Sequence, residues 1–315
     1  MLTFVLRRAA QMIPVVIGVT VATFALGQII PGDQASVLLG PGASDADRQA
    51  LRADMGLDRP ATLRYFTYLG NLLSGDLGRS LSFGRPVWSV LADRAGNTLL
   101  LSGTAIVVSA LLGVAIGTWA AMRPGSARDH GLTVGVLTLN SVPSFWLGLI
   151  LIMGFALHLR VVPATGMTSV GGGGAADVAA HMVLPVITLA AWSLAVIARM
   201  TRSAVLEVIG NDYVRTARAR GVGEFRVIVR HVLPNAMPSV VTVIGLQAGF
   251  LLSGAVLTET VFSWPGVGLA LYQAVGSRDI PLIQGGILLI AIAFVLINFL
   301  VDVLQAYFNP KIKLA

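Results

Sequence analysis

The chain has 315 residues, of which 55% are hydrophobic and only 12% are charged, and its mean hydropathy is +0.80. Soluble domains carry about a quarter charged residues, so this composition excludes an ordinary soluble protein and indicates an integral membrane protein. The net charge of +7 would suggest nucleic-acid binding in a soluble chain, but in a membrane protein the basic residues are assigned loop by loop. Cysteine is absent and the four histidines are scattered, so we expect no metal site.

The first predicted span follows Arg7 and Arg8. Residues 9–30 are apolar and long enough, at about 1.5 Å per residue, to cross a bilayer about 30 Å thick. A signal peptide has a shorter apolar core, and more apolar runs follow here, so we expect no cleaved signal. Residues 31–96 form a polar loop in which seven arginines balance seven aspartates, with predicted short helices over 45–55 and 63–73.

Five further apolar runs predict five more spans, over residues 97–122, 133–157, 183–198, 240–262 and 282–308. The run 183–198 is short, and it spans only if its helix continues through Arg199 and Arg202, whose side chains can snorkel.

Basic residues set the predicted orientation. With the N-terminus inside, the short inside pieces hold thirteen Lys and Arg residues and the short outside pieces hold two, which places both termini in the cytoplasm. The predicted fold is an all-α integral membrane protein with six transmembrane helices. Its predicted parts are 1–30 (N-terminus and first span), 31–96 (extracytoplasmic loop with short helices) and 97–315 (a five-span core with a cytoplasmic loop at 199–234).

A polar, arginine-rich stretch over residues 211–234 separates the fourth and fifth spans. Asn211 or Asp212 is a suitable N-cap and Gly221 a suitable helix stop, which predicts a short helix over 213–220. Such a compact basic element at the cytoplasmic surface is typical of a docking site, and contact with anionic lipid alone is the alternative. A helix-turn-helix for DNA is disfavoured because both ends run directly into spans.

A second short helix is predicted to begin at Glu224, whose charge suits a first turn. It should end at Leu233 and Pro234, because proline lacks the amide hydrogen and clashes with the preceding turn. Helical spacing places four side chains on one apolar face: Phe225, Ile228, Val229 and Val232.

Burying polar residues inside the predicted spans costs free energy unless they face protein or water. Three of them bracket Pro143, which predicts a kink, and they either line a path for a polar solute or satisfy the backbone around the proline. Glu259 lies near the outer end of the predicted fifth span. Its carboxylate is expected to contact a solute or a partner or, as the alternatives, to pair with Arg278 or to reach water. The predicted translocation path comprises Asn140, Ser141, Ser144, Gln247 and Glu259.

No G-x-x-x-x-G-K-[ST] motif occurs, so we expect no nucleotide site of the phosphate-loop kind in this chain, which is not itself the ATPase. GGGG at 171–174 lies in a predicted outside loop and is interpreted as a linker. No Ser/His/Asp or paired-carboxylate arrangement indicates an enzyme. Gly113 and Gly117, four residues apart, permit a close helix contact.

The stretch 211–234 resembles the signature of the inner-membrane permease subunits of binding-protein-dependent ABC importers, which is EAA, three residues, Gly, nine residues and I-x-L-P. Here Gly221 is followed after nine residues by HVLP, while Arg215, Thr216 and Ala217 stand in place of EAA. YVRTARARG is similar to the dipeptide/oligopeptide and nickel branch. Five further segments resemble that branch, so the resemblance covers essentially the whole chain: PGDQA, GDLGRSLSFGRPV, SVPSFWLGLILI, ETVFSWPGVG and VDVLQAYFNPKI.

The resemblance implies a type I importer permease of the cytoplasmic (inner) membrane that passes short peptides inward. The implied partners are a second, related permease that forms a heterodimer with this chain, two ATPase subunits that bind ATP and Mg²⁺, and an external solute-binding protein. We expect this chain to bind no cofactor and no nucleic acid. The alternatives are nickel or another peptide-like solute, and a stand-alone carrier or channel, which would need internal repeats and buried midplane acids. The implied ATPase-coupling residues are Tyr213, Arg215, Thr216, Ala217, Arg218, Ala219, Arg220, Gly221, Leu233 and Pro234.

Overall fold

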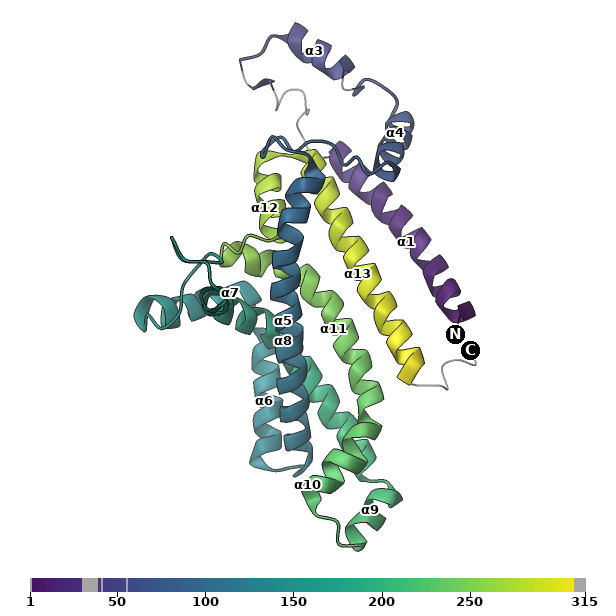
Figure 1. The fold of residues 1–315 in the computed structure, drawn as a ribbon, viewed down its shortest axis with the longest axis vertical. Helices are drawn as coiled ribbons and strands as arrows, with labels where there is room; N and C mark the ends of the chain where they lie inside the picture. Colours follow the sequence, from purple (N-terminus) through teal and green to yellow (C-terminus); the bar gives the residue numbers. More distant parts are fainter. Residues whose placement is uncertain (1, 30–38, 41, 55, 309–315) are drawn as a thin grey trace. The chain divides into compact units, whose positions relative to one another are not determined.

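The structure is a computed structural model that describes residues 2–29, 39–40, 42–54 and 56–308. In these ranges it contains helices and one isolated β-bridge, between Arg79 and Pro86, but no strand. The helices are α1 (Leu2–Ile29), α3 (Asp45–Asp54), α4 (Ala61–Leu73), α5 (Val87–Ala121), α6 (Ala127–Ser141), α7 (Ser144–Leu151), η1 (Ile152–His158), α8 (Ala175–Ile209), α9 (Asp212–Ala219), α10 (Glu224–Val227), η2 (Ile228–Val232), α11 (Leu233–Val261), α12 (Val267–Ser277) and α13 (Ile280–Phe308). The all-α prediction is confirmed for the described residues (Figure 1).

The described residues form two compact units. The first comprises residues 99–264 with the described ends 2–6 and 294–308, and it contains α6 to α11. The second comprises residues 7–98 and 265–293, with α3, α4 and α12. Helices α1, α5 and α13 contribute residues to both units. The polar stretch 211–234 and all predicted path residues lie in the first unit.

Five helices are long and apolar enough to cross a membrane, and a sixth span exists if a bent pair is counted as one. That pair is α6 with α7 and η1, bent by 101° at residues 142–143. The single span predicted over 133–157 is therefore two helices. Because Pro143 supplies no amide hydrogen and restricts the residue before it, the helix breaks there completely.

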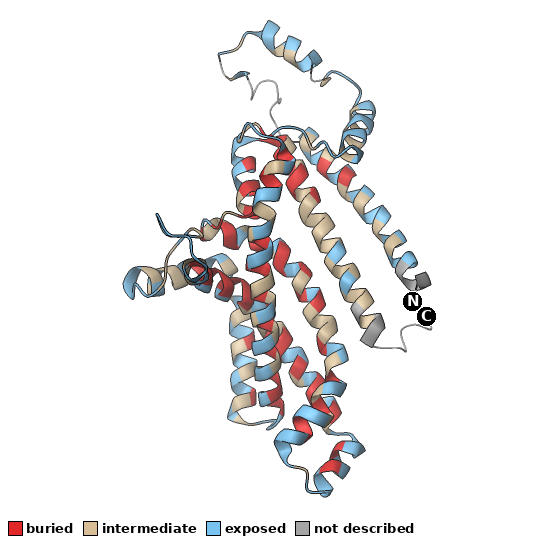
Figure 2. Cartoon of the chain, in the orientation of Figure 1, coloured by how far each residue is buried: buried red, intermediate tan, exposed pale blue. Residues whose placement is uncertain are grey.

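Helix α8 is the central element of the first unit, where it contacts α6, α7 and α11. It runs through Arg199 and Arg202 without a break, as the fourth predicted span requires. Buried residues follow α8 and α11, whereas the α9 region is mostly exposed (Figure 2).

Glycines set the closest helix contacts of this unit. A Cβ on Gly113 of α5 would lie 2.8 Å from Cγ2 of Ile197 on α8, and one on Gly117 would lie 2.8 Å from Cβ of Thr201. The close contact predicted for this glycine pair is therefore confirmed. Only a residue without a side chain lets α5 approach α8 so closely.

Polar contacts connect the elements of the second unit. Asp279, in the turn before α13, is fully buried; its Oδ2 accepts hydrogen bonds from Ser80 Oγ at 2.5 Å and from the Ser82 amide at 3.0 Å. Helix α4, predicted over 63–73, lies against α1, where the hydroxyls of Tyr65 and Thr20 are 3.0 Å apart. The predicted helix at 45–55 is α3, and α5 begins ten residues before the predicted 97, so the end of the predicted polar loop is helical.

Candidate functional site: the coupling segment and the helix break

The helix predicted over 213–220 is α9, displaced by one residue to Asp212–Ala219. Asn211 occupies the N-cap position with extended backbone, although its side chain makes no capping hydrogen bond. Gly221 has φ of +79°, the left-handed conformation that favours glycine and ends helices. The helix is therefore terminated as the sequence predicts. We call residues 211–234, which contain the predicted coupling residues, the coupling segment.

The inner face of α9 is packed against the rest of the unit. Val214 is fully buried and Ala217 is 9% exposed, and both belong to one apolar cluster with Val205 of α8, Val227 of α10 and Val232 of η2. Ala217, one of the implied coupling residues, faces inward. Its small side chain lets α9 approach its own neighbours, and the coupling segment is consequently anchored to the ends of α8 and α11.

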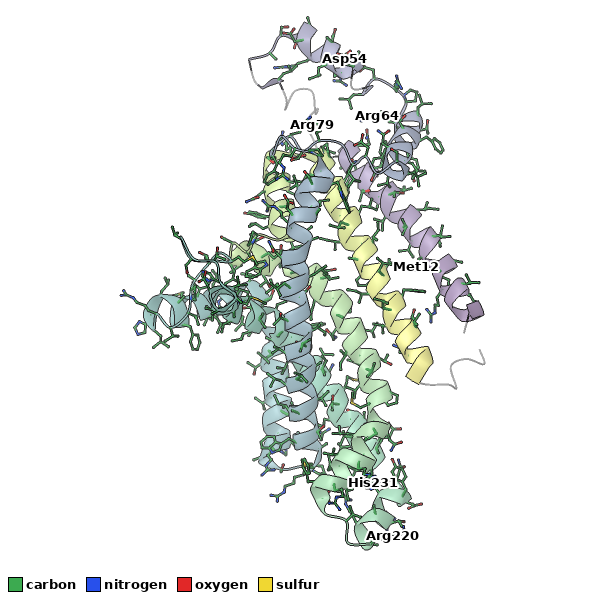
Figure 3. All side chains as sticks on the ribbon, in the orientation of Figure 1. Met12, Asp54, Arg64, Arg79, Arg220 and His231 are labelled. Carbon is green, nitrogen blue, oxygen red and sulfur yellow. The ribbon has the colours of Figure 1, made fainter. Side chains whose placement is uncertain are left out.

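The outer face of α9 carries most of the predicted coupling residues. Arg220 lies at the tip of the turn after α9, and His231 lies closer to the start of α11 (Figure 3). The Arg215 guanidinium is 3.6 Å from the Asp212 carboxylate, and both side chains are largely exposed, at 76% and 97%. The residues that the structure exposes here are Tyr213, Arg215, Thr216, Arg218, Ala219, Arg220 and Gly221.

A bidentate ion pair closes the turn between α9 and α10. Arg218 donates from Nε to Glu224 Oε2 at 3.0 Å and from Nη2 to Oε1 at 2.6 Å. Hydrogen bonding to the Glu224 carboxylate raises the pKa of the Arg218 guanidinium above its ordinary value, so the guanidinium stays protonated. The planar fork fixes the direction in which α10 leaves the turn.

The prediction that Leu233 and Pro234 end the second short helix is wrong. Helices α10, η2 and α11 follow one another without interruption. Together they form one continuous helix, Glu224–Val261, that is long and apolar enough to cross a membrane. Pro234 is the second residue of α11 and follows directly on the π-helical turn η2, so the break expected from its missing amide hydrogen does not occur. The preceding turn widens to a π-helix, and Asn235 Nδ2 donates to the His231 carbonyl at 2.7 Å.

The predicted apolar face of this helix is divided by the π-helical turn. Ile228 and Val232 are buried as predicted, but Phe225 is 79% exposed and Val229 47% exposed. Val227, which was not predicted, is buried instead. Phe225 and Val229 line an apolar groove of about 500 Å³ together with α5 residues.

An ion pair that sequence reasoning missed ties α6 to α8. Arg202 donates from Nη2 to Asp129 Oδ2 at 2.7 Å and from Nε to Oδ1, and the Gly125 amide donates to the same carboxylate at 2.9 Å. Asp129 is buried, so Arg202 pairs with it rather than snorkelling. The available signal was an acidic residue at the predicted cytoplasmic end of a span, where basic residues are expected.

The predicted path residues around Pro143 separate at the helix break. Asn140 and Ser141 are exposed at the end of α6, and Ser141 Oγ donates to the Leu137 carbonyl at 2.8 Å, a backbone bond of the kind expected beside a proline. Ser144, at the start of α7, lines a cavity of about 220 Å³ among α7, α8 and α11. We call this cavity the break cavity.

The other two predicted path residues lie on α11. Gln247 is 5% exposed, and its Oε1 accepts a hydrogen bond at 3.1 Å from Ser193, which lines the break cavity. Glu259 is completely buried, which overturns the alternative that its carboxylate reaches water. The structure thus brings Ser144 and Gln247 to one region and leaves Glu259 outside the cavity lining.

The sequence matches the family model described as binding-protein-dependent transport system inner membrane component over residues 113–314 and the N-terminal membrane-component model of such systems over residues 1–102. It is 44% identical, over 336 aligned residues and 99% of both chains, to the dipeptide transport system permease protein DppB of Escherichia coli (strain K12). It is also 44% identical, over 333 aligned residues and 99% of both chains, to the di/tripeptide transport system permease protein DppB of Pseudomonas aeruginosa (strain UCBPP-PA14).

Among solved structures, the fold is similar to a chain of the MetNI methionine ABC transporter in an inward-facing conformation, with a TM-score of 0.57 and 19% identity. The likeness covers 70% of this chain and 96% of that chain. At this identity the likeness concerns the fold alone.

Proposed function

Because the chain belongs to the family of binding-protein-dependent transport system inner membrane components, we propose that it is the permease subunit of an ATP-driven importer of short peptides. The observation that carries the substrate class is the full-length 44% identity to dipeptide and di/tripeptide permeases. The chain is a multi-pass membrane protein and a transporter component rather than an enzyme.

The rest of the assembly follows from the family's dependence on a binding protein. A solute-binding protein delivers the peptide outside, and ATPase subunits, which bind ATP and Mg²⁺, supply the energy. We propose two ATPases and a second, different permease, so that the path runs between two related membrane subunits. Both termini and the coupling segment face the cytoplasm of the inner membrane, as the distribution of basic residues indicates.

We propose that α9 is the element that binds the ATPase. Its apolar inner face fixes it to α8 and α11, so that a force on α9 moves those spans as a rigid body. Its exposed arginines supply charges that set the register against an acidic cleft. Leu233 and Pro234 act behind it, at the first turn of α11, rather than on the docking face.

Charge reversal on the outer face tests this role. In the complete assembly in proteoliposomes, Arg215→Glu should abolish peptide uptake and the stimulation of ATP hydrolysis by loaded binding protein, because it places a carboxylate against the ATPase. Arg160→Glu, at an exposed arginine far from the coupling segment in sequence, is the matched control and should keep both activities. Retention of both activities by Arg215→Glu would show that α9 does not couple.

A further inference from the structure

A polar pocket in the second unit is not explained by coupling to an ATPase. It has a volume of about 250 Å³ and lies among the end of α1, residues 56–59, α4, residues 76–78 and the start of α13, all of which belong to that unit. The distribution of basic residues predicts that these segments lie outside the cytoplasm. We call this pocket the outer pocket.

Charged residues of both signs line the outer pocket. Arg59 and Arg64 contribute two guanidinium groups, and Asp76 contributes one carboxylate. None of the ion pairs between described residues joins Asp76 to either arginine. The opposite charges therefore share one pocket without neutralising each other, and both remain available to a ligand.

Local contacts position the two guanidinium groups. Arg64 of α4 lies beside the end of α1 (Figure 3), where its Nη1 donates to Gln28 Oε1 at 2.9 Å. A Cβ built on Gly56 would lie 3.5 Å from Nε of Arg59, so this guanidinium group lies next to Gly56, and both residues line the pocket. Guanidinium groups bind carboxylates through paired, charge-assisted hydrogen bonds.

The carboxylate of Asp76 is only partly engaged. Its Oδ1 accepts a hydrogen bond from the Gly78 amide at 2.8 Å, whereas its Oδ2 has no hydrogen-bond partner among the described residues. One oxygen thus holds the side chain in place, and the other can accept a hydrogen bond from an ammonium group.

The rest of the wall and the size of the pocket suit a short peptide. Phe24 and Tyr68, whose ring centroids are 6.0 Å apart, and Ile280 line it with apolar surface. Pockets that take drug-sized ligands have volumes of about 300–1,000 Å³, so a pocket of about 250 Å³ suits a peptide of about two residues.

We propose that the outer pocket binds a short peptide as a zwitterion, with its terminal carboxylate on Arg59 and Arg64 and its terminal ammonium group on Asp76. Asp76 would repel a simple anion, and the two arginines would repel a simple cation, so a ligand with both charges matches the pocket best. This inference rests on the proposed function of peptide import.

The test measures peptide binding to the proposed complete transporter in nanodiscs, without binding protein or ATP. Equilibrium dialysis gives the dissociation constants of labelled alanyl-phenylalanine, of its C-terminal amide and of its N-acetyl derivative. The unaltered transporter should bind the free dipeptide more tightly than either blocked form.

Two variants should lose binding of different ends of the peptide. Arg64→Gln should weaken the free dipeptide about tenfold and leave the amide unchanged, because only the free dipeptide presents a carboxylate. Asp76→Asn should weaken the free dipeptide by a similar factor and leave the N-acetyl derivative unchanged. Both replacements keep the local hydrogen bond, to Gln28 or from Gly78; if Arg64→Gln does not assemble, Arg59→Gln replaces it.

An exposed ion pair of the same unit provides the matched control. Arg85 and Asp93 are 2.8 Å apart, and neither lines the outer pocket. Arg85→Gln and Asp93→Asn remove the same kinds of charge and should leave all three dissociation constants unchanged.

The proposal is overturned if the unaltered transporter shows no saturable binding of the free dipeptide, or if the Arg64 and Asp76 variants bind it as tightly as the unaltered transporter does. Equal weakening of all three compounds would also overturn it, because the two ends of the peptide would then not be distinguished. ATP-dependent uptake with binding protein, measured on the same preparation, tests the proposed function separately. Absence of uptake overturns peptide import, whereas uptake without binding at the outer pocket overturns the pocket alone.

Discussion

The coupling segment and the break cavity are two interruptions of the apolar helices, and the chain treats them in opposite ways. In the coupling segment, apolar side chains fill the interior and Arg218 is paired with Glu224. At the break, the chain bends by 101° between α6 and α7, and Thr188 Oγ1 on the neighbouring α8 has no partner among the described residues. A segment whose interior is filled and whose turn is ion-paired suits the transmission of force.

The largest effect should follow from opening the interior of the coupling segment. Val214→Asp places a charge in a fully buried position and should destabilise the unit by about 3–5 kcal/mol. Tyr213→Asp, one residue away and 44% exposed, is the control. Thermal unfolding of the purified complex measures both, and similar melting temperatures would mean that the inner face of α9 is not packed.

Breaking the Asp129–Arg202 pair should have the next largest effect. Asp129→Leu leaves the Arg202 guanidinium without its bidentate acceptor, so the melting temperature should fall clearly. Adding Arg202→Met removes the stranded charge and should recover most of the loss. A double variant no more stable than the single one would show that the pair does not join α6 to α8.

The Gly221 turn provides a smaller, purely conformational test. Gly221→Ala should cost about 1–2 kcal/mol, because φ is +79° and no atom lies within 4 Å of the added Cβ. Gly223→Ala is the control, since φ there is −60° and the space is also open. Equal melting temperatures for the two variants would contradict a left-handed Gly221.

The smallest effect is expected for the exposed Arg218–Glu224 pair. A double-mutant cycle with Arg218→Gln and Glu224→Gln should give a coupling energy of about 0.5–1 kcal/mol that weakens with salt. The same cycle for Arg215 and Asp212, whose atoms are 3.6 Å apart, should give less. If the coupling energy of Arg218 and Glu224 were no larger than that of Arg215 and Asp212, the Arg218–Glu224 pair would not fix the turn.

Local signals predicted the parts that local chemistry decides. The N-cap at Asn211 and the left-handed glycine at 221 located α9 to within one residue. The glycine pair on α5 predicted the contact with α8 because only close backbone approach requires glycine at both positions. The apolar runs predicted the spans because apolar length is what a bilayer requires.

The features that the sequence did not predict depend on tertiary context. Pro234 does not end a helix because a π-helical turn and Asn235 accommodate it, and neither can be deduced from proline alone. The burial of Glu259 and the inward face of Ala217 depend on which helices pack around them. The Asp129–Arg202 pair joins residues 73 positions apart, beyond the reach of any spacing rule.

ATP-dependent peptide uptake tests the central claim most directly. Proteoliposomes containing the chain with the proposed second permease and ATPases should accumulate labelled dipeptide only when external binding protein and internal ATP are both present. The isolated chain, reconstituted alone, should transport none. Uptake by the isolated chain, or uptake by the full assembly without ATP, would contradict the account and favour a stand-alone carrier.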